Sequence, residues 1–363
     1  MRESAATTTP VTLLTGFLGS GKSTLLTQIL RDPRFNDTAV VVNEFGEVGL
    51  DGFLVEHGSE QLVEMTTGCL CCTIRGDIRQ TLLDLDARRE RGAVPAFTRL
   101  IVETTGLADP APVIHTLVKD PGVARRYRLA GIVTTVDAVN GEHTLGTHAE
   151  SVKQVAVADR LVLTKTDLAQ DPASRRDLRA LTTALGRINP GALLLDRHDP
   201  DFDLRRLFDT ALFDPAEKSP DVQRWLNAEA FAGIHGDKEG HHHHHHDVNR
   251  HSADIQAYCL VLERPIGRMA FQAALDMLIA SQGADLLRVK GIVNVREHPE
   301  RPAVIHGVQH VFHDPVLLAA WPSEDRRTRI VFITRGIPRD SIETLFAIWQ
   351  DAEEQSLAEP ATT

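Results

Sequence analysis

The chain has 363 residues, of which 42% are hydrophobic and 25% charged, a composition typical of globular proteins that excludes the disordered, collagen-like and coiled-coil classes. At about 150 residues per domain, this length predicts two domains. Fifty acidic residues against 39 basic ones give a net charge of −11, which repels a phosphate backbone and excludes nucleic acid as an expected partner. The sequence contains no apolar run near the ~18 residues that span a bilayer and no N-terminal secretory pattern, so we expect a cytoplasmic protein without a membrane partner.

Short apolar runs alternate with longer stretches of helical spacing through the first half of the chain. The runs lie at residues 11–15, 39–43, 100–103, 131–136, 160–164 and 192–195, and the helical stretches lie at 23–31, 76–91, 111–118 and 174–188. Alternation at this spacing is typical of βα units, which place parallel strands side by side. We therefore predict an α/β fold over residues 9–212, with a parallel sheet that carries helices on both faces.

A polar segment rich in glycine and histidine follows at residues 213–253, where we predict a linker or loop. A smaller α+β domain is predicted over residues 254–352. Its expected strands lie at 254–264, 286–295, 303–312 and 329–334, and its expected helices at 268–283 and 338–349. We expect the tail after residue 351 to be frayed.

Residues 16–23 read Gly-Phe-Leu-Gly-Ser-Gly-Lys-Ser, which fits the pattern GxxxxGK[ST] of a phosphate-binding loop between a strand and a helix. In such a P-loop the main-chain N–H groups surround the phosphates, the lysine contacts the outer phosphates, and the serine hydroxyl binds Mg²⁺. The predicted nucleotide-binding residues of this loop are Gly19, Ser20, Gly21, Lys22, Ser23 and Thr24.

Magnesium in a P-loop protein is also held by an acid at the end of a second strand. Glu103 ends the apolar run at 100–103, in the place usually held by aspartate, and Gly106 is expected near the γ-phosphate. We predict Lys22, Ser23 and Glu103 as catalytic residues; the alternative for Glu103 is an ordinary charge at a strand end. No glutamine follows Gly106 where Ras-like GTPases keep the residue that positions water, so we expect slow intrinsic turnover.

A base-recognition element follows the apolar run at 160–164. Its carboxylate, Asp167, can accept hydrogen bonds from N1–H and from the exocyclic N–H of guanine, a pattern that adenine lacks, while the stem of Lys165 packs on the ring. Thr164 stands where such elements usually carry asparagine. Thr164, Lys165 and Asp167 therefore predict GTP as the nucleotide, with ATP as the alternative.

Three of the four cysteines, Cys69, Cys71 and Cys72, lie within four consecutive positions. Thiolates brought together within a single turn suit Zn²⁺ or Co²⁺, and a tetrahedral site then needs one further ligand. Glu44 and Glu47 are candidates for that ligand because they follow the second apolar run, where a first switch is expected, and we include Glu47 in the predicted metal site. The alternatives are a redox disulfide between Cys71 and Cys72, or buried small side chains.

Histidines are concentrated in the predicted linker, which contains six in a row. Flexible neutral imidazoles bind divalent transition metals weakly and adaptably, so this tract is predicted to collect metal as an auxiliary loop. The alternatives are an inserted affinity tag or a polar linker without a role. The residues of the tract are His241, His242, His243, His244, His245 and His246.

Four other side chains are given structural roles. Cys259 lies in an apolar strand and is expected in the core, and Asp137 is expected to cap the helix that follows it. The strand period at 303–312 places His306 and His310 on one face.

Several of these segments together resemble the CobW-type family of P-loop GTPase metallochaperones. The resemblance rests on GFLGSGKST at 16–24, NEFGEVGLDG at 43–52, GCLCC at 68–72, ETTGLADP at 103–110 and TKTD at 164–167, with LLRVKG at 286–291 and HGVQHVF at 306–312 similar to the C-terminal domain of that family. The resemblance implies a P-loop GTPase domain followed by a CobW-like domain. It also implies that the Cys-x-Cys-Cys motif is the metal site.

The implied function is a GTP-hydrolysing metallochaperone or metal insertase that delivers zinc or cobalt to a client metalloprotein. Because the cysteines fall between the two segments expected to sense the γ-phosphate, we expect GTP to assemble the thiolate site and hydrolysis to loosen it. The alternatives are a GTP-gated metal sensor or store without a dedicated client, and a GTPase with a redox cysteine pair. The oligomeric state is left open.

Overall fold

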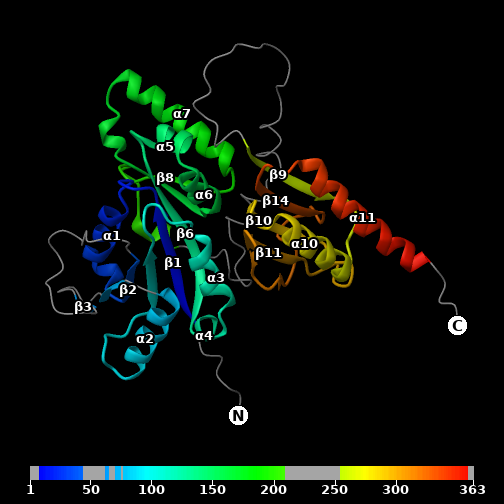
Figure 1. Cartoon of the computed structure of the whole chain (residues 1–363), viewed down its shortest axis with the longest axis horizontal. Coiled ribbons are helices and arrows are strands. Elements are labelled where there is room, and N and C mark those ends of the chain that lie inside the picture. The colour runs from blue at the N-terminus through cyan, green and yellow to red at the C-terminus, as the bar shows by residue number, and fades with distance from the viewer. Residues whose placement is uncertain (1–7, 44–61, 65–69, 75–76, 209–253, 359–363) are drawn as a thin grey trace. The chain divides into compact units, whose positions relative to one another are not determined.

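The computed structural model describes residues 8–43, 62–64, 70–74, 77–208 and 254–358, and for residues 43, 62–64, 70–74 and 358 it describes the backbone alone (Figure 1). The chain forms two compact units. The first comprises Met1–Thr182 with Ala192–Thr210, and the second comprises Thr183–Gly191 with Ala211–Thr363. None of the helices in the described part of the chain has the length and hydropathy needed to cross a membrane.

The first unit is built on an eight-stranded sheet in the order β3-β4-β2-β5-β1-β6-β7-β8. All neighbouring strands pair in parallel except β3, which is antiparallel to β4. The six strands predicted from the sequence are confirmed, and with them the α/β fold class. They are β1 (Thr9–Gly16), β2 (Thr38–Asn43), β5 (Arg99–Glu103), β6 (Tyr127–Asp137), β7 (Arg160–Thr164) and β8 (Leu193–Asp196).

The two remaining strands, β3 (Leu62–Glu64) and β4 (Leu70–Ile74), extend the sheet beyond β2 and were not expected. The sequence analysis places the cysteines in a turn, but the backbone at Cys71 and Cys72 is a strand, in register with Val40 and Val41 of β2. Threonine and isoleucine, which end this segment, favour extended structure. Their β propensity was overlooked because the segment was interpreted from its cysteines, as metal ligands, a redox pair or buried side chains.

Helices cover both faces of the sheet. Leu25 and Ile29 of α1 (Lys22–Arg31) pack in one buried cluster with Val133 of β6. On the same strand, Thr134 donates its hydroxyl proton to the main-chain carbonyl of Gln154 in α6 (Ala149–Val157), at 2.8 Å. Because successive strand residues face opposite sides, α1 and α6 lie on opposite faces.

The remaining helices of this unit follow strands along the chain. Those predicted at 76–91, 111–118 and 174–188 are confirmed as α2, α3 and α7, whereas α4, α5 and α6 were not expected. Six of the nine residues of α6 are buried, and only Ala149, Glu150 and Lys153 are partly exposed, so its polar face is too narrow to be recognised from the sequence. The bounds are α2 (Ile78–Glu90), α3 (Ala111–Lys119), α4 (Pro121–Ala124), α5 (Gly141–Thr147) and α7 (Pro172–Ile188), with short 3₁₀ turns η1 (Pro33–Phe35), η2 (Thr166–Leu168) and η3 (Leu204–Leu207).

The second unit contains an antiparallel sheet in the order β12-β11-β10-β14-β9, with β13 beside β11. Phe271, Phe332 and Phe346, which belong to α10, β14 and α11, lie in one buried cluster, so both helices pack on the same face of the sheet. This is the smaller α+β architecture expected from the sequence. The elements are β9 (Ile255–Leu262), α10 (Arg268–Gln282), β10 (Leu286–Val293), β11 (Ala303–Val308), β12 (Val311–Phe312), β13 (Val316–Leu317), β14 (Thr328–Arg335) and α11 (Arg339–Ala358).

Two predictions for this unit were wrong. The run at 303–312 is a hairpin rather than one strand, because the backbone turns at Gln309, where φ is +51°. His310 is consequently exposed in the turn while His306 is buried in β11, so the two do not share a strand face. The C-terminal helix continues past residue 351 to Ala358, and Glu353 on this extension accepts the Gly267 N–H at 2.8 Å, which holds it to the start of α10.

Candidate nucleotide-binding site

The P-loop connects β1 to α1 through backbone conformations that favour glycine. Gly16, Gly19 and Gly21 have φ values of +138°, +70° and +91°. At Gly16 a Cβ atom would also lie 2.4 Å from the Thr135 hydroxyl oxygen on β6. The glycine spacing of the motif therefore reflects both the turn and the close approach of β6.

Lys22 begins α1 and extends its side chain back over the loop. Its Nζ donates hydrogen bonds to the carbonyl oxygens of Gly16 at 2.8 Å and Phe17 at 3.0 Å. These bonds hold the ammonium group above the main-chain N–H groups of the loop and the N-terminus of α1. A cation at a helix N-terminus suits a phosphate group.

Ser23 and Glu103 are brought together from the first turn of α1 and the end of β5. The serine hydroxyl donates to Glu103 Oε1 at 3.3 Å, and Glu103 is 4% exposed. The register of β1 and β5 sets Leu14 opposite Glu103, and this places the Glu103 carboxylate next to the loop that follows β1. A hydroxyl and a carboxylate are hard oxygen ligands of the kind that Mg²⁺ prefers, so the predicted pair fits this ion.

The loop after β5 lies between the P-loop and α6. Thr104 donates its hydroxyl proton to the Thr15 hydroxyl at 2.8 Å, and a Cβ atom on Gly106 would lie 2.6 Å from the main-chain nitrogen of Leu18. On its other side, Gln154 donates to the carbonyl oxygens of Gly106 and Ala108. Sequence reasoning placed Gly106 here but missed Gln154, because it lies on a helix that was not expected.

Thr164 joins the base-recognition element to the P-loop. Its hydroxyl lies 2.8 Å from the carbonyl oxygen of Ser20 and 3.2 Å from that of Val136, so its single proton is available to both acceptors. A Cβ atom on Gly21 would lie 3.2 Å from the Thr164 methyl group. The residue that departs from the usual asparagine thus still ties β7 to the phosphate loop.

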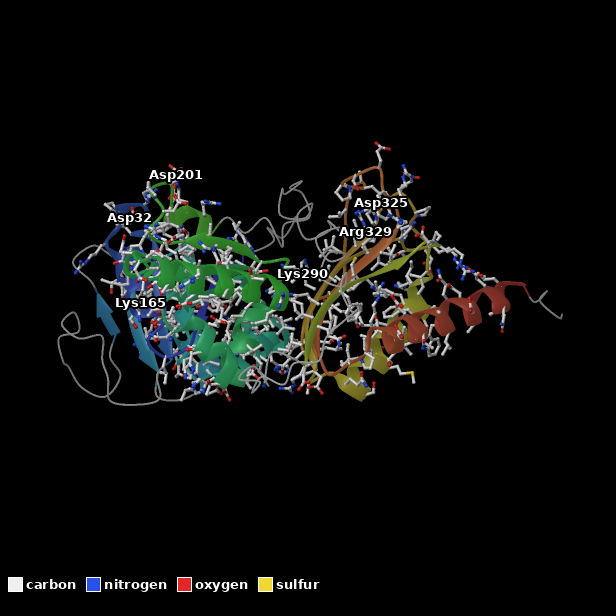
Figure 2. All side chains as sticks on the ribbon, turned by 90° about the horizontal axis from the view of Figure 1, so that it is seen from above. Asp32, Lys165, Asp201, Lys290, Asp325 and Arg329 are labelled. Carbon is white, nitrogen blue, oxygen red and sulfur yellow. The ribbon has the colours of Figure 1, made fainter. Side chains whose placement is uncertain are left out.

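Lys165, which is labelled in Figure 2, follows in a left-handed conformation, with φ of +59°. Its ammonium group pairs with Asp137 at 2.7 Å. Asp137 also accepts the N–H groups of Val139 and Asn140, at 2.8 and 3.2 Å. Burial works to raise the pKa of Asp137, but hydrogen bonds from Lys165 and Asn140 outweigh burial and hold the pKa below its ordinary value. Asp137 was expected to cap the next helix; it instead stabilises the turn that precedes α5, whose N-cap is Asn140.

Asp167 presents its carboxylate to solvent, with 53% of the side chain exposed. His198 Nε2 lies 3.2 Å from Asp167 Oδ1, and His198 Nδ1 lies 3.0 Å from the Thr166 hydroxyl. Thr166 in turn donates to Asp196 at the end of β8, at 2.6 Å. Because the carboxyl ends of parallel strands meet at one edge of a sheet, the position of His198 just after β8 was the signal that could have predicted it.

The predicted metal residues lie mostly outside the described part of the chain. Cys69, Glu44, Glu47 and residues 241–246 fall outside it, and Cys71 and Cys72 are described as backbone in β4. Within the described residues, no group of three or more histidine, cysteine, aspartate or glutamate side chains is arranged to hold a metal ion.

The fourth cysteine, Cys259, is buried in β9 as expected. Burial raises the pKa of its thiol to about 11, which disfavours the thiolate that a metal site needs.

Comparison with known families gives two matches. Residues 10–195 match the family described as "CobW/HypB/UreG, nucleotide-binding domain". Residues 255–348 match the family described as "Cobalamin synthesis protein cobW C-terminal domain".

Similar proteins cover nearly the whole chain. Zinc chaperone YjiA of Escherichia coli strain K12 is 32% identical over 337 residues, which cover 93% of this chain and 97% of the relative. Zinc-regulated GTPase metalloprotein activator 1 of Schizosaccharomyces pombe is 29% identical over 359 residues, which cover 92% and 84%. The crystal structure of Zn(II)-bound YjiA GTPase from E. coli aligns with a TM-score of 0.71 at 30% identity and covers 94% of this chain and 99% of that one.

Proposed function

Since this chain belongs to the CobW family and is a GTPase, we propose that it is a zinc chaperone that loads Zn²⁺ at a cysteine site and delivers the ion to a client protein. The resemblance noted in the sequence is thereby confirmed at the level of the family. The proposal rests on the hydrogen bond between Ser23 and Glu103 and on the position of the Lys22 ammonium over the P-loop. Together these residues supply the magnesium ligands and the phosphate-binding cation that GTP hydrolysis requires.

Each group at the phosphate site has a role in hydrolysis. Ser23 and Glu103 would hold Mg²⁺, which supplies charge neutralisation for the β- and γ-phosphates when bound. The Lys22 ammonium binds the outer phosphates, and the loop amides up to Thr24 orient the chain of phosphates. Residues 104–109 of the loop after β5 contain no glutamine, so slow intrinsic turnover remains the expectation.

Guanine selectivity is assigned to Asp167. Its exposed carboxylate can accept both N1–H and the exocyclic N–H of guanine, while Thr164 fixes the element against the P-loop. Adenine offers an acceptor at N1, so the same carboxylate would face a lone pair. The family membership and the name of the fission yeast relative support GTP over ATP.

The cargo site is proposed at Cys69, Cys71 and Cys72, with Glu47 as the further ligand. Three thiolates and one carboxylate suit tetrahedral Zn²⁺, and they would also accept Co²⁺. The names of the relatives favour zinc. The tract 241–246 would serve as a weaker collecting loop.

The strand that carries two of the cysteines is connected to the nucleotide site through neighbouring strands of the sheet. Strand β4, which carries two of the cysteines, pairs with β2, and β2 pairs with β5, whose last residue is Glu103. The segment that contains Glu47 continues directly from the carboxyl end of β2. We therefore assign the coupling between GTP and zinc to this part of the sheet.

Two complementary variants test the proposal. Replacing Cys71 and Cys72 by alanine should abolish stoichiometric zinc binding under reducing conditions while GTP binding survives. Lys22→Ala should abolish tight GTP binding while zinc binding survives. Cys259→Ala, which removes a buried thiol of the second unit, is the control for loss of a cysteine as such. Zinc that stays stoichiometric in the double cysteine variant would contradict the assignment.

Client delivery needs a separate measurement. A chaperone should hydrolyse GTP faster when an apo client is added, because release of zinc then completes the cycle. A hydrolysis rate that is indifferent to every apo metalloprotein tried would favour a GTP-gated sensor or store.

A further inference from the structure

Gln154 is a buried polar side chain of α6. It is 0% exposed, on a helix in which Val152, Val155 and Val157 are also buried. Burying a carboxamide is unfavourable unless it makes hydrogen bonds. A leucine would fill this position without that cost, so the bonds that Gln154 makes indicate why a glutamine stands there.

Both protons of the Gln154 amide are used on one loop. Nε2 lies 3.1 Å from the carbonyl oxygen of Gly106 and 3.1 Å from that of Ala108. This loop follows Glu103 and packs at Gly106 against the main chain of Leu18 in the P-loop. Gln154 therefore holds the loop from the side opposite the phosphate site.

The helix that carries Gln154 is itself fixed to the sheet and to both loops. The Gln154 carbonyl accepts the Thr134 hydroxyl proton at 2.8 Å, and the neighbouring Lys153 pairs with Asp109 at 2.8 Å. At the N-terminus of α6, the His148 ring stacks on Phe17 of the P-loop with centroids 4.4 Å apart. The Lys153–Asp109 pair and the His148–Phe17 stack thus connect this helix to the loop after β5 and to the P-loop.

The carboxamide also has an acceptor in reserve. Gln154 Oε1 is buried and has no hydrogen-bond partner among the described residues. In a trans peptide the C=O and the following N–H point in opposite directions, so holding the Gly106 carbonyl fixes the direction of the Leu107 N–H.

We propose that Gln154 is a positioning residue for the γ-phosphate, which holds residues 106–108 in the arrangement that a triphosphate contacts and a diphosphate does not. The inference rests on the proposed function, in which Gly106 lies near the γ-phosphate. It goes beyond that function by assigning the discrimination between GTP and GDP to a side chain that touches neither nucleotide.

Two variants test the role by their effect on the ratio of two affinities. Gln154→Glu keeps the shape but loses both donated bonds, and Gln154→Leu removes the polar group. Binding of GDP and of a non-hydrolysable GTP analogue is measured by calorimetry with Mg²⁺ present. The affinity for the analogue should fall about tenfold more than the affinity for GDP, which corresponds to roughly one net hydrogen bond to the loop. The kcat should fall with it.

Thr134→Val is the matched control, because it removes a buried hydrogen bond of the same helix and leaves the loop bonds in place. It should change neither the ratio of affinities nor kcat. If the Gln154 variants weaken GDP and the analogue by the same factor, or weaken neither, Gln154 only packs the helix. A wild-type chain that binds no GTP would instead contradict the proposed function.

Hydrogen exchange on the wild-type protein gives a check that needs no variant. Exchange of the amides at 104–109 and at 149–157 should slow together when the triphosphate analogue replaces GDP. Protection of the loop without any change in α6 would overturn the role of Gln154.

Discussion

Thr164 occupies the position where guanine-binding elements usually carry asparagine, and the structure explains why threonine works there. Its hydroxyl reaches the carbonyl oxygen of Ser20 in the P-loop, while the close approach of Gly21 leaves little room for a larger group. The function of the position is therefore to join two loops. The sequence alone raised doubt about guanine selectivity here because the pattern identifies residue types, not the bonds they make.

Removing this hydroxyl should weaken GTP binding without unfolding the protein. Thr164→Val keeps the shape and loses one hydrogen bond of about 1 kcal/mol, so GTP affinity should fall about fivefold. Thr164→Ser, which keeps the hydroxyl, serves as the control and should bind GTP as the wild type does. Calorimetry with Mg²⁺·GTP measures both, and equal affinities for the valine and serine variants would contradict the role of the bond.

Asp167 should determine which base is bound. In Asp167→Asn an amide NH2 group replaces one carboxylate oxygen, so one N–H group of guanine loses its acceptor. Xanthine has a carbonyl oxygen at C2, which can accept a hydrogen bond from this NH2 group. We expect GTP affinity to fall by at least about fivefold and XTP affinity to rise, because an unpaired polar group in a recognition site costs about 1–3 kcal/mol. Competition binding with GTP, XTP and ATP checks this. An Asp167→Asn protein with unchanged preference would remove Asp167 from base recognition.

At the scale of elements, the alternation of apolar runs predicted the six parallel strands and the four long helices of the first unit, because buried βα units leave a strong periodic signal. It missed β4 because the segment was interpreted from its cysteines, and it missed α6 because the partly exposed face of this nine-residue helix contains only two charged residues. The P-loop and Glu103 were predicted because both lie at the carboxyl end of an apolar run that the sequence shows clearly. Gln154 and His198 were not, because their roles depend on tertiary contacts with loops distant in sequence.

The turn between β6 and α5 should contribute stability that depends on pH. Asp137→Asn loses the pair with Lys165, and we expect the free energy of unfolding at pH 7 to fall by about 1–3 kcal/mol. Because the pKa of Asp137 is lowered in the folded state, its contribution is fully present above the unfolded pKa of about 3.9 and is lost as the pH falls through the folded value. Urea unfolding of both proteins between pH 7 and 3 measures this. A difference that stays constant below pH 4 would contradict the assignment.

At the scale of the whole molecule, the chain combines a nucleotide unit, a second unit of antiparallel sheet and helices, and a histidine-rich segment that precedes β9 in sequence. The tract 241–246 is proposed as a weak collecting loop distinct from the cysteine site. Deleting these six residues should lower the total zinc bound at high zinc concentration while the tight site and the GTPase rate stay unchanged. Zinc titration with a competing chelator separates the two classes, and loss of the tight class on deletion would place the tract in the primary site.

Coupling between GTP and zinc is the central claim, and linkage makes it reciprocal: zinc must tighten GTP binding by the factor by which GTP tightens zinc binding. The most direct measurement is the calorimetric affinity of a non-hydrolysable GTP analogue with and without stoichiometric Zn²⁺. The account predicts that zinc tightens binding by roughly 5- to 150-fold, and that the effect disappears when Cys71 and Cys72 are alanine. Equal affinities with and without zinc in the wild-type protein would contradict it.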